Sequence, residues 1–160
     1  MKRNQVVAAA ALALVLVASL ATTACKTSGM AATTRGQVLR LDIVHPDNLP
    51  EAGEDNLDVI ISNVGINNIR DVVVDVEIPP QLIVLNQTHD RGVTVTNAPG
   101  SNLYTYTFGN IQPAENSMLR FRVRTAFGTM TETGSVKATA YQRDLPGDKL
   151  VETAVIRLRK

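Results

Sequence analysis

The stretch VIISNVGINNIRDVVVDVEIPPQLIVL, residues 59–85, decides the fold of this chain. In its second apolar run, residues 72–78, every even position is apolar and the odd positions include Asp75 and Glu77. A period of two places alternate side chains on opposite faces of an extended strand. The pair Pro79-Pro80 then ends the run, because proline has no N–H to donate to a sheet. The stretch therefore predicts β-strands with one buried and one solvated face.

The same alternation recurs through residues 37–160. The apolar positions of the other runs are Leu39, Leu41 and Ile43; Leu57, Val59 and Ile61; Tyr104, Tyr106 and Phe108; Leu119, Phe121 and Val123; Val136, Ala138 and Ala140; and Ala154, Ile156 and Leu158. Clusters of Gly, Pro, Asn and Asp separate the runs, and no sustained helical period occurs. This pattern predicts an all-β domain, an antiparallel Ig-like β-sandwich of about 7–9 strands.

The turn Asn63-Val64-Gly65 has its own local explanation. The side-chain amide of Asn63 can cap the turn, and Gly65 can adopt a positive φ there.

Several segments resemble the DUF-eleven family, a repeat domain of bacterial surface and cysteine-rich outer-membrane proteins. The resemblance lies in the Asn-x-Gly turn at 63–65, the strand and proline turn of 72–82, GNIQPAENSMLRFRVR at 109–124, and GSVKATAYQRDLPGDKLVETAVIRL at 134–158. It covers residues 37–160 and implies an Ig-like fold. The family supplies no catalytic residues that could be transferred to this chain.

The N-terminus has the three parts of a secretory signal, which we place at residues 1–24. Lys2 and Arg3 precede an uncharged run from Val6 to Ala21, and small residues follow up to Ala24. Cys25, the only cysteine, comes next and resembles the cysteine of a bacterial lipobox, although Thr22 stands where that motif prefers Leu. The resemblance implies that Cys25 is the lipid attachment site and receives acyl chains. Ordinary cleavage after Ala24 or Ala21, giving a soluble secreted or periplasmic protein, is the alternative.

The segment after the cysteine predicts the location of the domain. Residues 25–36 read as the lipidated Cys followed by a flexible linker, KTSGMAATTRG, and residues 37–160 as the sandwich domain. Lys26 stands where an Asp would be the motif-based signal for the inner membrane. The predicted location is therefore the cell envelope, in the outer membrane if the bacterium has two membranes.

The composition and the spacing of polar residues do not indicate a catalytic or nucleic-acid-binding function. Without Lys2 and Arg3, 14 basic and 15 acidic side chains remain, a formal charge of −1. His45 and His89 lack metal-ligand spacing, and we interpret Glu51, Glu54, Asp55 and Asp58 as a solvated loop rather than a calcium site. We predict no enzyme activity, metal, cofactor or nucleic acid partner.

The predicted function is that of a non-catalytic, lipid-anchored module that binds or scaffolds another envelope protein or polymer. The alternative is a periplasmic carrier or assembly factor that binds an apolar ligand or an extended peptide strand.

Arginines form the main candidate binding surface in the domain. Arg120, Arg122 and Arg124 share one strand face, and Arg157 and Arg159 share a face of the last strand. If the two strands are close, the five guanidiniums form an anion-binding face for the phosphate groups of envelope lipids or polymers. The alternative is that alternating arginines keep these strands soluble.

Overall fold

The computed structural model describes residues 29–32, 38–90, 92–128 and 133–159. The signal peptide and Cys25 lie outside these residues. The strands are β1 (Gly29–Ala32), β2 (Val38–Val44), β3 (Asn48–Pro50), β4 (Glu54–Asn63), β5 (Ile69–Glu77), β6 (Leu82–His89), β7 (Val93–Asn97), β8 (Leu103–Ile111), β9 (Asn116–Thr125), β10 (Thr133–Gln142) and β11 (Leu145–Arg159). In the described residues, no helix is long and apolar enough to span a membrane.

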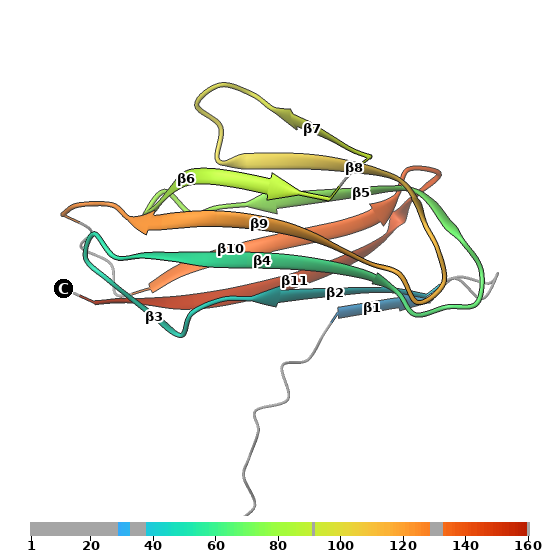
Figure 1. Cartoon of the computed structure of the whole chain (residues 1–160), viewed down its shortest axis with the longest axis horizontal. Helices are drawn as coiled ribbons and strands as arrows, with labels where there is room; N and C mark the ends of the chain where they lie inside the picture. Colours follow the sequence, from blue (N-terminus) through green and yellow to red (C-terminus); the bar gives the residue numbers. More distant parts are fainter. Residues whose placement is uncertain (1–28, 33–37, 91, 129–132, 160) are drawn as a thin grey trace, which may run out of the picture.

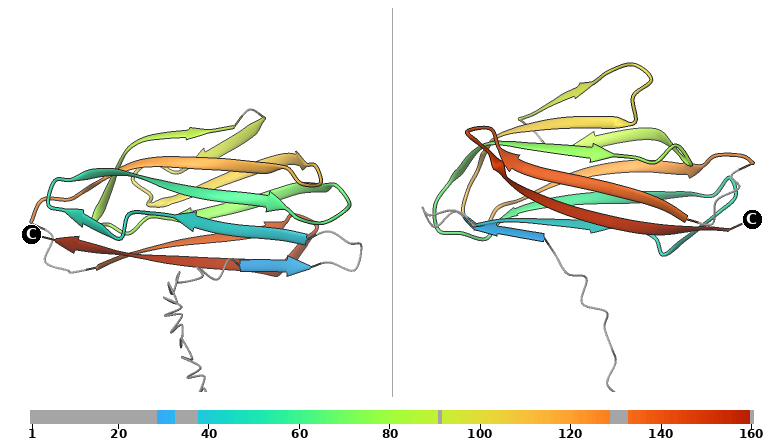
Figure 2. Two further views of the ribbon diagram at one scale, coloured as in Figure 1. Left: turned by 60° about the horizontal axis from the view of Figure 1, so that its bottom comes forward. Right: turned by 180° about the vertical axis from the view of Figure 1, so that it is seen from behind.

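The strands form two stacked sheets (Figures 1 and 2). The first sheet has the order β1-β2-β4-β9-β6, and the second has the order β3-β11-β10-β5-β8-β7. Neighbouring strands are antiparallel except for the short parallel pair of β3 with β11. This arrangement confirms the predicted all-β sandwich, with more strands in the described residues than the 7–9 expected.

The core lies between the sheets and is built from the alternating apolar positions. Leu41, Leu57, Val59 and Phe121 have no exposed surface, and the alternating apolar positions of β5, β10 and the second half of β11 (Ala154, Ile156 and Leu158) are buried with them. The rings of Tyr104 and Tyr106 pack edge-on against Phe121, with centroids 5.5 and 5.9 Å away. Burial of this apolar surface is the main stabilising contribution available to the domain.

Asn63 joins the end of β4 to two other segments from a fully buried position. Its Nδ2 donates to the carbonyl oxygens of Asn67 (2.8 Å) and Ile111 (2.9 Å), and its Oδ1 accepts from the Gly65 N–H (3.0 Å). The predicted cap is confirmed. The predicted positive φ of Gly65 is wrong, since among the described glycines that conformation occurs at Gly92, Gly100 and Gly128.

The stretch predicted to be a flexible linker contains a strand. Residues 29–32 form β1, which pairs antiparallel with β2 from Gly29 opposite Leu41 to Ala32 opposite Val38. Backbone groups alone make such a ladder, so it can form without the side-chain alternation by which the other strands were predicted. The described part of the linker is therefore the edge strand of the first sheet.

Candidate functional site

The structure separates the five candidate arginines. Arg120, Arg122 and Arg124 lie on β9 in the first sheet, whereas Arg157 and Arg159 lie near the end of β11 in the second. Side chains exposed on the two sheets of a sandwich point away from each other. The condition for one continuous basic face is therefore not met.

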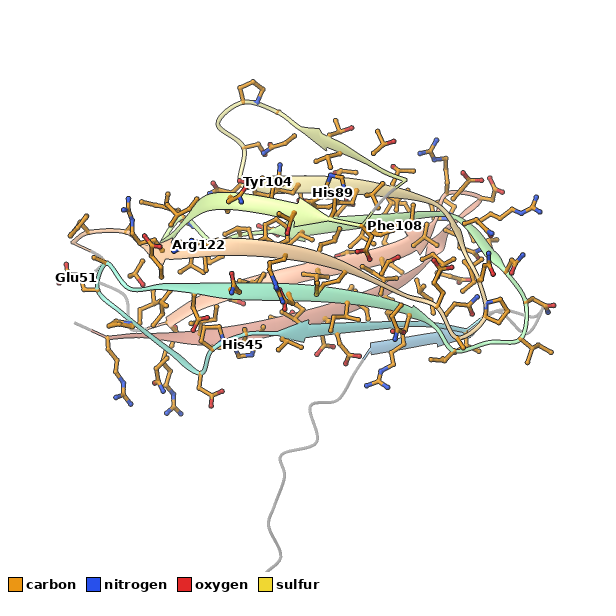
Figure 3. All side chains as sticks on the ribbon, in the orientation of Figure 1. His45, Glu51, His89, Tyr104, Phe108 and Arg122 are labelled. Atoms are coloured by element: carbon orange, nitrogen blue, oxygen red, sulfur yellow. The ribbon has the colours of Figure 1, made fainter. Side chains whose placement is uncertain are left out.

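Acidic residues of β4 pair with two of the β9 arginines. Arg120 donates from Nε and Nη2 to the two carboxylate oxygens of Asp58, both at 2.7 Å, and this bond raises the pKa of the guanidinium. Arg122, which is labelled in Figure 3, donates from Nε and Nη2 to a single oxygen, Oε2 of Glu54, at 3.1 and 2.8 Å. A bidentate carboxylate occupies the donors that a phosphate would use.

These pairs also correct the interpretation of the acidic cluster. Glu54 and Asp58 belong to β4 rather than to a solvated loop. A third pair, Arg40 with Asp42 at 2.8 Å, lies on β2 of the same sheet. Three ion pairs therefore neutralise Arg40, Arg120 and Arg122 on the outward face of the first sheet. Arg124, the third arginine predicted for this face, takes part in none of these pairs, and its Nε is buried without a hydrogen-bond partner among the described residues.

The outward face of the second sheet differs in chemistry. On β7 and β8, Thr94 lies opposite Thr107 and Thr96 opposite Thr105, and the Thr105 hydroxyl donates to Asp75 at 2.7 Å. On β11, the valines at 151 and 155 are 48% and 55% exposed. This face therefore presents threonine hydroxyls and exposed valines beside charged side chains such as Glu77 and Lys137.

The two histidines lie on different parts of the fold, as Figure 3 shows. His45 Nδ1 contacts the Pro46 carbonyl oxygen at 2.9 Å, while His89 packs its ring edge-on at 6.2 Å from Tyr106. No group of three or more His, Cys, Asp or Glu side chains able to hold a metal occurs among the described residues.

Tyr106 links the two sheets at the β6 side of the sandwich. Its hydroxyl donates to Gln87 Oε1 at 2.5 Å, and its ring is buried in the core. Burial raises the pKa of Tyr106 above its ordinary value of about 10, and the neighbouring Tyr104 adds to the effect. At a pH slightly above 10, the Tyr106 phenol therefore stays protonated in the folded state, whereas a tyrosine in the unfolded chain releases its proton.

This pKa shift predicts a loss of stability in alkali. Because the folded pKa is raised, the contribution of Tyr106 is complete below about pH 10 and falls as the pH rises further. In an ultraviolet titration of tyrosinate, we expect Tyr106→Phe to leave the curve of the folded chain unchanged up to about pH 11. The same variant should lose one third of the amplitude in denaturant, since the chain has 3 tyrosines. A reduced amplitude in the folded state would contradict the assignment.

Comparison with known proteins supports the fold. No protein-family model matches the chain, and no curated protein matches it. Among solved structures, it is similar to one titled the RrgA Jo.In complex, with a TM-score of 0.58, 10% identity, and coverage of 79% of this chain and 82% of that chain.

Two further similar structures have different activities in their titles. A cohesin–dockerin complex from Clostridium thermocellum gives a TM-score of 0.51 at 8% identity, covering 71% of this chain and 90% of that one. AvmM, described as catalysing macrocyclization in alchivemycin A biosynthesis, gives 0.54 at 13%, covering 81% and 95%. At these identities the likeness defines an Ig-like or cohesin-like β-sandwich and nothing finer. Membership of the DUF-eleven family stays a prediction.

Proposed function

We propose that this chain is a non-catalytic, lipid-anchored protein of the cell envelope whose sandwich binds another envelope protein. The observation that carries the proposal is the position of Cys25, between a signal-like N-terminus and the edge strand of a domain built as a sandwich. Two similar structures are titled as complexes, one of a cohesin with a dockerin, and this favours a protein partner over a polymer.

The fold also suggests which side faces the membrane. Four residue steps separate Cys25 from Gly29, the first residue of β1, and they span at most about 14 Å. β1 lies beside β11 (Figure 2), whose exposed Arg157 and Arg159 lie on the same side of the sandwich but at the C-terminal end of the strand, away from β1. Among the described residues, no ion pair engages these two arginines. On an anchored chain this side would lie close to the headgroups, where the guanidiniums could bind lipid phosphates.

The anchor is tested by replacing the cysteine. We expect Cys25→Ala to move the protein from the membrane fraction to the soluble fraction, because the acyl chains supply the membrane affinity. Fractionation after a high-salt wash measures this, and labelling with a radioactive fatty acid reports the modification itself. Ser28→Ala, a similar small change nearby, should remain labelled and membrane-bound. If Cys25→Ala stays in the washed membranes, anchoring through this residue is wrong.

A further inference from the structure

The four edge strands of the sandwich differ in how well they are protected against pairing with a further strand. In the first sheet, β6 is interrupted by a register shift between Val84 and Asn86. In the second sheet, β3 has only three residues and ends at Pro50. Bulges, short length and proline are the devices by which natural proteins prevent an edge from pairing with another strand. β1, the remaining edge of the first sheet, lies on the side of the proposed anchor.

β7 has none of these devices. Its sequence, VTVTN, has no charge and no proline, and it pairs with β8 in unbroken register from Val93 opposite Phe108 to Asn97 opposite Tyr104. In an antiparallel edge strand, alternate residues direct their N–H and C=O groups away from the only neighbour. Among the described residues, no hydrogen bond joins these outward groups to another segment. β7 is therefore an open template for one more strand.

The side chains of β7 specify which strand would fit. Val93 and Val95 are half-buried and pack on the core together with Val84 of β6, whereas Thr94 and Thr96 are exposed on the outward face. An added strand would place every second side chain over this apolar side and the others beside the threonine hydroxyls.

We propose that the β7 edge binds an extended segment of another protein, in which apolar residues alternate with Thr, Ser or other small polar residues. The proposal rests on the proposed function and names its binding surface. β7 lies on the opposite side of the sandwich from β1 (Figure 1), so an anchored chain presents this edge away from its own membrane. Two copies anchored in one membrane would not meet edge to edge, which favours a different protein over a second copy.

The test uses a synthetic probe, the blocked peptide Lys-Thr-Val-Thr-Val-Thr-Val-Thr-Lys, added to the full chain in detergent micelles. Amide hydrogen exchange should slow on the order of 10-fold at alternate residues of β7 and not along β3 or β6. Two N-methylated peptides test whether binding uses one edge of the peptide backbone. One is methylated at the valines and the other at the threonines. Only one of the two should bind, since methylation blocks the ladder on one edge of the peptide and leaves the other intact.

A matched pair of variants locates the site. Thr96→Lys places a charge on the proposed edge and should weaken the peptide affinity at least about 10-fold. Thr153→Lys places the same charge on β11 of the same sheet and should leave the affinity unchanged. Equal binding of both methylated peptides, protection outside β7, or equal effects of both variants would overturn the proposal. So would a concentration-dependent dimer of the free chain that Thr96→Lys dissociates, which would assign the edge to a second copy. Neither readout depends on lipidation, so a failure here is separate from a failure of the Cys25→Ala test.

Discussion

Asn63→Leu is expected to lower the free energy of unfolding by about 2 to 4 kcal/mol, although leucine fills nearly the same volume. The substitution removes both Nδ2 donors and the Oδ1 acceptor. The carbonyl of Ile111, buried at the end of β8, is then left without this partner, whereas the groups in the 64–68 turn can partly return to water. A buried polar group without a partner costs about 1 to 3 kcal/mol.

Urea denaturation measures this loss through a lower midpoint at an unchanged m-value. Asn110→Leu, on the exposed surface of the same strand β8, is the matched control and should change stability by no more than about 0.5 kcal/mol. If the two variants lose the same stability, the buried hydrogen bonds of Asn63 contribute nothing beyond the generic effect of replacing an asparagine.

The strand faces could be predicted because a period of two is a local property. The even positions from Val72 to Ile78 are buried in the structure, and so are the alternating positions of β9 that include Leu119 and Phe121. The strands β6 and β7 could not be predicted in the same way. LIVLNQTH opens with four consecutive apolar residues instead of an alternation, and VTVTN alternates valine with threonine over only four residues, which is too short a run to be distinctive.

The candidate arginine site shows a second limit of prediction from sequence, which is the pairing of side chains between strands. Alternation places Arg120 and Arg122 on one face of their strand, and the structure keeps them on one face. The partner of Arg120 is Asp58, 62 residues earlier in the chain, and the partner of Arg122 is Glu54, 68 residues earlier. The order of strands in each sheet decides these pairs, and likewise it separates Arg120 from Arg157. Sequence spacing carries no signal for strand order, so the neutralisation of Arg120 and Arg122 was not predictable.

Phe121→Ala is expected to cost about 3 to 5 kcal/mol, because it removes the side chain against which both core tyrosines pack. Phe121 has no exposed surface and lies on the inward face of β9, with the rings of Tyr104 and Tyr106 at its edges. The cavity left between the sheets cannot close without moving strands that are fixed by their ladders. The near-ultraviolet circular dichroism of the tyrosines should weaken as their packing loosens.

Phe121→Leu separates the loss of volume from the loss of the aromatic contacts. It keeps most of the apolar bulk and should cost less than the alanine variant, about 1 to 2 kcal/mol. Phe127, which is 73% exposed beyond the end of β9, supplies the matched control, and Phe127→Ala should stay within about 0.5 kcal/mol of the parent chain. Equal losses for Phe121→Ala and Phe127→Ala would mean that the packing of β9 against β8 does not hold the two sheets together. The expected difference of several kcal/mol would place the centre of the fold at the aromatic contact between these strands.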